Sequence, residues 1–268
     1  MLHMSAKTES PLLSELERPA ARALNARGQG QAFLVCEHAS RFIPDSLNGL
    51  GLSDEAARSH AAWDIGALEL SVELMGALDA PLVHSRVSRL VYDCNRPPSA
   101  PDAVPAKSER FEVPGNVDLT HAHRTSRVAE VYEPFRDLLS RTLDARPTPS
   151  VMITIHSFTP IYRGQPRTVE LGILHDSDDR AAQLLLEAAQ GSGLDTALNE
   201  PYSATDGVTH TLREHALKRG LPNVMIEVRN DLINSPEGVN RISGLLAPML
   251  AQVVDQLTAL EKTGEAPA

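Results

Sequence analysis

Three short apolar runs along the chain each end at a residue that can titrate. Phe33–His38 and Val151–His156 end in a histidine, and Val224–Glu227 ends in a glutamate. Runs of this kind are typical of strands that are buried on both faces of a parallel sheet, where ligands bind at the carboxyl ends of the strands. The pattern therefore predicts core strands whose ends meet at one site.

The remaining pattern predicts strands and helices that alternate along the chain. Further strands are predicted at Ala80–Ser85 and Thr168–Leu174. Apolar residues three and four apart predict helices at Ile65–Leu78, Ser126–Ala145, Asp178–Ala189, Thr209–Arg219 and Ile242–Leu260. The apolar face expected for the first helix consists of Ile65, Leu68, Val72, Met75 and Leu78. This alternation predicts a three-layer α/β fold with a mainly parallel central sheet.

The chain shows no repeat, low-complexity tract or linker that would divide it. We therefore expect a single catalytic domain at residues 31–262, a mobile N-terminal extension at 1–30 and a disordered tail at 263–268. Within the extension, a short helix or turn is expected near Leu12–Asn25. The stretch Pro97–Thr120 contains five prolines and is predicted to be a long loop of the kind that carries function.

Composition narrows the class of protein. The 268 residues are 42% hydrophobic and carry a net charge of −10, which argues against a nucleic-acid binder and against an anionic membrane surface as partner. No apolar run approaches the roughly 18 residues of a membrane span, so a cytoplasmic protein is expected. Cys36 and Cys94, the two cysteines, are expected to be reduced.

Histidines and carboxylates gather at the predicted strand ends. Two neutral imidazoles plus one carboxylate are the usual protein ligands of a catalytic zinc ion. His38 and His156 would supply the imidazoles, and residue types alone leave Glu37 and Asp64 both open as the carboxylate. Glu227 would then serve as general base and acid in amide hydrolysis.

The alternative interpretation is structural. Asp64 stands at an N-cap position of the predicted helix, and Glu227 could simply pair with Arg229. The pair His121 and His123 has a spacing that could bind a metal, but it lies in the predicted loop, where such spacing is usually incidental.

Arginines and asparagines follow the predicted strands in two groups. Guanidinium groups bind carboxylates through paired hydrogen bonds, so these residues suit a small anionic substrate. The candidate substrate-binding residues are Arg86, Arg89, Asn95, Arg96, Ser157, His210, Arg229 and Asn230.

Five short motifs together resemble those of a known family. They are Cys36–Ser40 with Ile43-Pro44, Asp64–Gly66, Arg89 through Asn95–Pro97, His156–Phe158 and Glu227–Asp231. Their order and spacing, across about residues 31–256, are similar to the N-formylglutamate amidohydrolases, also called N-formylglutamate deformylases, and to a less characterised branch of them. The resemblance implies a phosphorylase/hydrolase-like fold, shared with zinc carboxypeptidases and zinc muramoyl-alanine amidases.

The resemblance also implies roles for individual residues. By similarity to the amidases, His38, Asp64 and His156 hold zinc or another divalent metal, and Glu227 is the general base. The carboxypeptidase pattern would place an acid at residue 41, which is an arginine here, so Asp64 is preferred and Glu37 is kept as the reserve ligand.

The implied reaction is hydrolysis of N-formyl-L-glutamate to formate and L-glutamate. Two alternatives stay open. The first is a zinc amidohydrolase for another acylated amino acid or for a peptidoglycan fragment. The second is a binding protein for a small dicarboxylate, without catalysis. The sequence does not indicate an oligomeric state.

Overall fold

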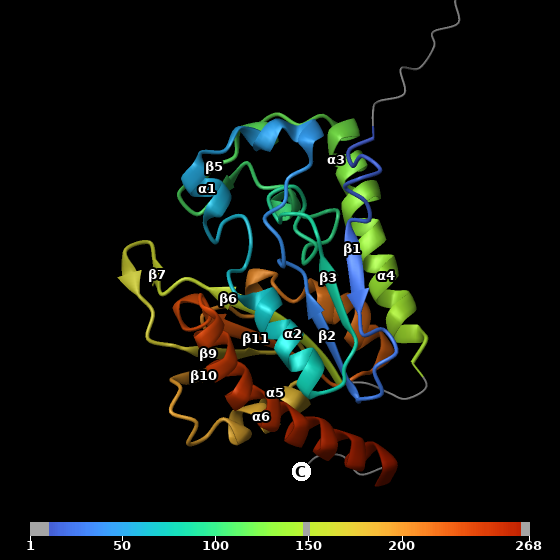
Figure 1. Cartoon of the computed structure of the whole chain (residues 1–268), viewed down its shortest axis with the longest axis vertical. Coiled ribbons are helices and arrows are strands. Elements are labelled where there is room, and N and C mark those ends of the chain that lie inside the picture. Colours follow the sequence, from blue (N-terminus) through green and yellow to red (C-terminus); the bar gives the residue numbers. More distant parts are fainter. Residues whose placement is uncertain (1–10, 147–150, 264–268) are drawn as a thin grey trace, which may run out of the picture.

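A seven-stranded sheet forms the centre of the part of the chain that the computed structural model describes, residues 11–146 and 151–263 (Figure 1). The spatial order is β1-β3-β2-β6-β11-β9-β10. The bounds are β1 Ala21–Leu24, β2 Ala32–Cys36, β3 Leu82–Ser85, β6 Val151–Phe158, β9 Leu171–Leu174, β10 Thr196–Leu198 and β11 Asn223–Arg229. The four central strands β3, β2, β6 and β11 are parallel, whereas β1 and β9 run antiparallel to their inner neighbours. The predicted mainly parallel sheet is therefore confirmed.

Strand β2 shows why the first apolar run is continuous. Leu34 and Cys36 pack into a core on one face of the sheet, and Phe33 and Val35 pack into a second core on the other face. Successive side chains of a strand point to opposite faces, so a strand covered on both sides needs apolar residues at every position.

Helices form the two outer layers. On one face lie α2 (Ala67–Ala77), α5 (Arg180–Ala188) and α6 (Pro236–Thr263). The other face is covered by a continuous helical stretch made of α3 (His121–Arg127), a π-helical turn (Val128–Tyr132) and α4 (Glu133–Asp144), as Figure 1 shows. The helix predicted at Thr209–Arg219 is a short irregular element that includes a π-helical turn at Leu212–Ala216. The three-layer prediction is confirmed.

The expected apolar face of the helix at Ile65–Leu78 is correct only in part, because Leu68, Met75 and Leu78 are half-buried against the core, whereas Val72 is exposed. Helix α2 buries Ala67, Leu70 and Leu74 against the sheet, while the side of Val72 is 37% exposed. The helix carries two adjacent apolar stripes, and the sheet takes the one that contains the small Ala67. The N-cap is Gly66, in a left-handed conformation, so the Asp64 side chain does not cap the helix.

The expectation of a mobile extension is wrong for residues 11–30. Leu12 and Leu13 are buried, and in place of the short helix or turn expected near Leu12–Asn25 the chain has a turn at residues 15–17 followed by β1, which pairs antiparallel with β3. Residues 21–24 lie beside β3, an edge that would otherwise have unpaired backbone groups, and pairing there outweighs their helical propensity. Residues 1–10 and 264–268 lie outside the described residues, and α6 continues to Thr263, the first residue of the predicted tail.

Two small hairpins project from the layers. One, β4 (Lys107–Ser108) with β5 (Phe111–Glu112), lies in the predicted proline-rich loop. The other, β7 (Ile161–Tyr162) with β8 (Gln165–Pro166), follows β6 and extends from the side of the molecule in Figure 1. The first turn of α3 contains His121 and His123, both exposed, rather than the loop expected there.

None of the described helices combines the length and the apolar character that a membrane span requires.

Candidate metal centre and active site

Neighbouring parallel strands bring the predicted site residues together. His38 lies two residues beyond β2, whereas His156 and Glu227 belong to β6 and β11. A fourth strand of this set, β3, leads into the segment that contains Asp93. Because β3, β2, β6 and β11 are adjacent and parallel, their carboxyl ends meet at one edge of the sheet.

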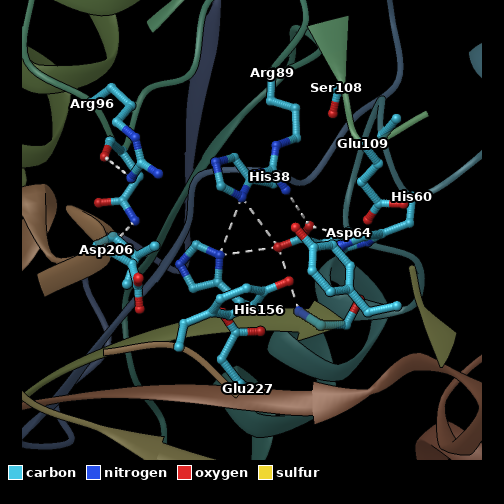
Figure 2. A pocket seen from close by; sticks show the side chains of 16 residues that line it. His38, His60, Asp64, Arg89, Arg96, Ser108, Glu109, His156, Asp206 and Glu227 are labelled. Carbon is cyan, nitrogen blue, oxygen red and sulfur yellow. Dashed lines mark hydrogen bonds and ion pairs between the residues drawn. The ribbon is translucent and has the colours of Figure 1, made fainter. Parts of the chain in front are cut away.

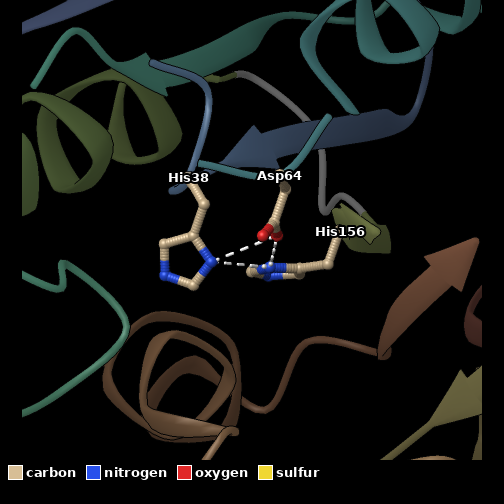
Figure 3. A group of neighbouring side chains, drawn as sticks. All are labelled: His38, Asp64 and His156. Carbon is tan, nitrogen blue, oxygen red and sulfur yellow. Dashed lines mark hydrogen bonds and ion pairs between the residues drawn. The ribbon is translucent and has the colours of Figure 1, made fainter. Parts of the chain in front are cut away.

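Two histidines and one aspartate form a compact triangle of donor atoms (Figure 3). Nδ1 of His156 lies 3.2 Å from Nδ1 of His38 and 3.0 Å from Oδ2 of Asp64, and the His38 Nδ1–Asp64 Oδ2 distance is 3.2 Å. Ligand atoms about 2.0–2.1 Å from a tetrahedral zinc ion lie roughly 3.3 Å from one another. The three side chains therefore fit a single divalent metal ion, with a further position left for a small ligand.

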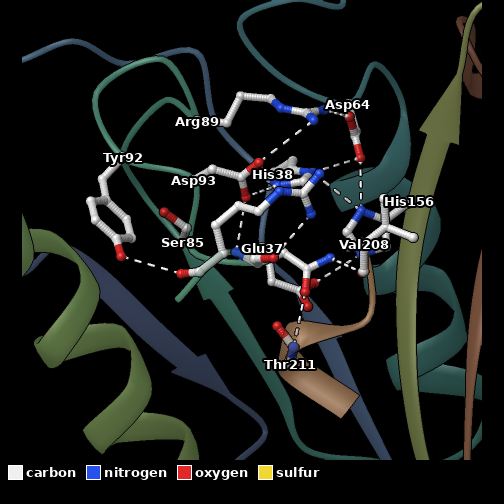
Figure 4. A network of polar contacts seen from close by, with 12 residues as sticks. Glu37, His38, Asp64, Ser85, Arg89, Tyr92, Asp93, His156, Val208 and Thr211 are labelled. Carbon is white, nitrogen blue, oxygen red and sulfur yellow. Dashed lines mark hydrogen bonds and ion pairs between the residues drawn. The ribbon is translucent and has the colours of Figure 1, made fainter. Parts of the chain in front are cut away.

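The far nitrogen of each histidine faces a buried carboxylate, as Figure 4 shows. His38 Nε2 is hydrogen-bonded to Oδ1 of Asp93 at 2.7 Å, and His156 Nε2 lies at ion-pair distance, 3.2 Å, from Oε2 of Glu37 without the geometry of a hydrogen bond. A carboxylate at Nε2 holds the proton on that nitrogen and leaves the Nδ1 lone pair free for a metal. Glu37, the reserve ligand, therefore lies on the side of His156 away from the donor triangle.

The electrostatics of the triangle favour positive charge. Burial lowers the pKa of His156, but Glu37 and Asp64 more than offset it, so that the pKa of this histidine is raised well above its ordinary value. Burial alone would raise the pKa of Asp64. Its contacts with His38 and His156 outweigh burial, so that the pKa lies well below its ordinary value. A divalent cation held by these three side chains would supply the positive charge that the site favours.

Glu227 is buried beside this triangle, and its Oε2 has no hydrogen-bond partner among the residues that the structure describes. It is paired with His156 in the register of β11 and β6, so both side chains lie on the same face of the sheet. Burial raises the pKa of Glu227 to about 7. A carboxyl group with a pKa near neutrality can both accept and return a proton, which is the property of a general base and acid.

A cavity of about 290 Å³ opens above the triangle (Figure 2). Its lining includes the triangle, Glu227 and two arginines, together with residues of both hairpins and of the segment near residue 206. Those lining residues that carry polar groups are His38, His60, Asp64, Arg89, Asn95, Arg96, Ser108, Glu109, His156, Ser157, Tyr162, Tyr202, Asp206 and Glu227.

Four of the candidate substrate-binding residues line this cavity. Arg89 donates to Asp64 Oδ1 at 3.0 Å, and Arg96 donates to Asp102 Oδ2 at 2.9 Å. The Asn95 side chain accepts a hydrogen bond from the backbone N–H of residue 211 at 2.9 Å. Ser157 Oγ donates to the carbonyl of residue 65 at 2.8 Å. Their polar groups thus also hold the walls of the cavity in place.

The other four do not line it. Arg86 donates to backbone carbonyls of the N-terminal segment, at residues 17 and 19, and His210 Nε2 lies 2.8 Å from the Tyr132 hydroxyl. Arg229 pairs with Glu170 and Asp231, and Asn230 follows it in a short helical turn away from the cavity. These residues were predicted to be at the site because they lie close in sequence to predicted elements, but their side chains do not reach the cavity. Because Arg229 pairs with other acids, the structural interpretation of Glu227 as its partner is wrong as well.

Several residues in or behind the site were not singled out from the sequence. Asp93 is a lone acid in a loop, and its only signal is that a metal-binding histidine needs a hydrogen-bond acceptor behind it. His60 lies 3.5 Å from Asp64 Oδ1, and Tyr162 and Tyr202 contribute ring faces from distant segments. In the sequence, His60, Tyr162 and Tyr202 carry no pattern that distinguishes them from ordinary loop residues.

Comparisons with known proteins identify a matching family and similar structures. The family model described as N-formylglutamate amidohydrolase matches residues 31–234. A gene product of Agrobacterium tumefaciens of known structure is 47% identical, has a TM-score of 0.90, and the match covers 93% of this chain and 99% of that chain. No curated protein sequence matches the chain significantly.

A second solved structure shows the same fold at greater distance. It is the N-formylglutamate amidohydrolase of Ralstonia eutropha JMP134, with a TM-score of 0.61, 20% identity, and coverage of 88% of this chain and 98% of that chain. Since the family model spans most of the chain, the chain belongs to the N-formylglutamate amidohydrolase family.

Proposed function

We propose that this amidohydrolase uses a divalent metal, zinc in the first instance, to release formate from N-formyl-L-glutamate. The observation that carries the proposal is the buried triangle of His38, Asp64 and His156 beside a buried Glu227 whose Oε2 has no hydrogen-bond partner among the described residues. As a member of a family of amidohydrolases, the chain cleaves amide bonds, so the alternative of a binding protein without catalysis is set aside.

The residues divide the work of hydrolysis. His38, Asp64 and His156 would hold the cation, with Asp93 and Glu37 fixing the orientation of the two imidazoles. When bound, the metal acidifies a water molecule and polarises the amide carbonyl. Glu227 takes the proton of the attacking water and delivers it to the leaving nitrogen, which its pKa of about 7 suits.

The cavity supports a small substrate rather than a peptidoglycan fragment. Its volume of about 290 Å³ is at the lower end of the range for small-molecule sites, roughly 300–1,000 Å³. Glu109 and Asp206 also line it, and these acids favour an amino-acid part with one carboxylate over one with two. A formylated or otherwise acylated neutral amino acid is therefore the second candidate substrate.

Formate release with and without a chelator tests the proposal. We expect N-formyl-L-glutamate to be hydrolysed by the zinc-loaded protein, activity to vanish after chelation, and zinc to restore it. Glu227→Gln should lower kcat by about 10²- to 10⁴-fold. The matched control is Glu73→Gln at an exposed position of α2, which should retain activity. Full hydrolysis by Glu227→Gln would exclude this residue as the base.

Metal content tests the ligands directly. A His38→Ala/His156→Ala double variant should lose stoichiometric zinc, measured by elemental analysis of the folded protein. The matched control is His121→Ala/His123→Ala, which removes two exposed histidines of α3 and should keep its zinc. The opposite result would move the metal site to α3.

A further inference from the structure

An arginine that the sequence did not single out lies between aromatic rings at the edge of the cavity. The guanidinium carbon of Arg167 is 4.5 Å from the ring centre of Tyr162, 5.0 Å from that of Tyr202 and 5.4 Å from that of Phe158. Both tyrosines line the cavity above the donor triangle. Aromatic faces hold a planar guanidinium in one orientation while they leave its edge free for hydrogen bonds.

Arg167 differs from the other arginines around the site in having no acidic partner among the described residues. Arg89 is paired with Asp64 and Asp93, and Arg96 with Asp102. The carboxylate closest along the chain, Glu170, is paired with Arg229 instead. The positive charge of Arg167 is therefore not neutralised within the part of the chain that the structure describes.

The hydrogen bonds of Arg167 leave donors unused. Nη1 donates to the carbonyl of Thr159 at 3.3 Å, and Nη2 donates to the hydroxyl of Tyr202 at 3.1 Å. A guanidinium carries five N–H donors, so the others are available to a ligand. The backbone around it is held as well, because Arg229 donates to the carbonyls of residues 167 and 168. Arg229 thus supports Arg167 rather than binding substrate.

We propose that Arg167 binds a carboxylate of the acylated amino acid and so holds the substrate with its amide over the donor triangle. The inference rests on the proposed function for the identity of the substrate. A fork of free N–H donors, fixed by ring faces beside a cavity, matches the geometry in which arginine binds a carboxylate. Because the two lining arginines are already neutralised, Arg167 is the cation that determines the charge of the substrate's amino-acid part.

Three related compounds test this assignment. N-formyl-L-glutamate has both carboxylates, N-formyl-L-glutamine lacks the side-chain carboxylate, and N-formyl-L-isoglutamine lacks the α-carboxylate. For the wild-type protein, loss of the carboxylate that Arg167 binds should raise KM by about 10- to 100-fold, as for a charged hydrogen-bond pair. Arg167→Met should raise KM for N-formyl-L-glutamate by a similar factor and abolish the discrimination against one of the two amides.

The matched control is Arg163→Gln. Arg163 stacks on the same ring, 5.2 Å from the centre of Tyr162, but it is exposed at the turn of the β7–β8 hairpin and does not line the cavity. We expect this variant to keep the wild-type discrimination. Arg167→Lys should recover part of it, because it keeps the charge without the planar fork. Unchanged discrimination against both amides in Arg167→Met would overturn the proposal.

Calorimetry separates this proposal from the proposed function. If no formylated compound is hydrolysed, the substrate assignment fails, and binding of glutarate to the metal-loaded protein then tests Arg167 alone. Binding that weakens about 10-fold or more in Arg167→Met, but not in Arg163→Gln, supports the carboxylate site. Equal binding by both variants, or no binding by the wild-type protein, contradicts it.

Discussion

At the scale of single residues, the site depends on carboxylates that would not touch the metal. Asp93 and Glu37 each face the far nitrogen of a histidine whose near nitrogen belongs to the donor triangle. Such contacts decide which tautomer each histidine adopts and in which direction its lone pair points. The affinity for a metal ion held by the triangle would thus depend on residues that a list of ligands would omit.

Asp93→Asn should weaken zinc binding by about 10- to 100-fold, because the amide is a poorer acceptor for the N–H of His38. A competition titration against a chromophoric chelator measures this change. Asp137→Asn is the control, since that carboxylate pairs with Arg136 on the surface of α4. Equal zinc affinities of the two variants would show that Asp93 does not orient His38.

The pH dependence of hydrolysis should report Glu227. Burial raises its pKa to about 7, and only the ionised form can accept a proton from water. We therefore expect kcat/KM to rise with pH and to level off above about pH 7, or somewhat lower because a bound cation stabilises the carboxylate. A profile from pH 5 to 8 at constant ionic strength measures it. Activity that falls with rising pH across this range is incompatible with Glu227 as the base.

At the scale of elements, strand β9 approaches the site through a glycine. A Cβ at Gly172 would lie 2.1 Å from the carbonyl oxygen of Glu200 and 3.2 Å from Cβ of Glu227. The absence of a side chain allows the segment that carries Tyr202 to lie against the sheet next to the proposed base. The close approach of Gly172 to the backbone of Glu200 thus brings Tyr202 and Glu227 together in the cavity wall.

Two glycine-to-alanine substitutions should have opposite effects on stability. Gly172→Ala forces a clash with backbone and should lower the free energy of unfolding by on the order of 2–4 kcal/mol. Gly76→Ala, in α2, places its Cβ where there is nothing within 4 Å, and should raise it by about 0.5–1 kcal/mol. Denaturant unfolding of both variants measures the two changes, and an effect of the same sign would contradict this account.

The elements differ in how well the sequence predicts them. Strands β2, β6 and β11 were predicted because burial on both faces leaves an unbroken apolar run. Helix α2 was predicted in its position, but its buried face only in part, because Leu68 and Met75 pack against the core at the edge of the face, whereas Val72 is exposed. His38, Asp64, His156 and Glu227 could be grouped from strand ends and motifs.

Residues that act through loops could not be grouped in this way. Asp93 contacts His38 and Arg167 contacts the lining tyrosine Tyr162 because separate segments pack together, and no spacing in the sequence encodes that packing. The arginines next to strand ends were overvalued for the same reason. Position along the chain places Arg86 and Arg229 near the site, whereas their hydrogen bonds direct both side chains elsewhere.

At the scale of the whole molecule, the N-terminal segment closes one side of the fold. Leu13 is 2% exposed and β1 extends the sheet beyond β3, whereas Leu16 in the same segment is 95% exposed. Residues 11–24 therefore belong to the folded structure, and their removal would expose a strand edge that favours association with other chains.

Leu13→Ala should lower the free energy of unfolding by about 2–5 kcal/mol, because it removes a buried side chain from a packed core. Leu16→Ala is the control and should change it by less than about 0.5 kcal/mol. Thermal unfolding of the two variants at equal protein and zinc concentrations makes the comparison. Equal melting temperatures would mean that this segment does not contribute to the folded state.

The segment between β3 and α3 contributes to the site at two separate places. Asp93 at its start orients a histidine, while the β4–β5 hairpin at its far end contributes Ser108 and Glu109 to the rim. The buried Arg127 ties the two ends of the segment to the core, with bonds to the carbonyl of residue 91 and to Asn116. Changes in the hairpin would therefore alter the rim of the cavity while the donor triangle at the strand ends stays in place.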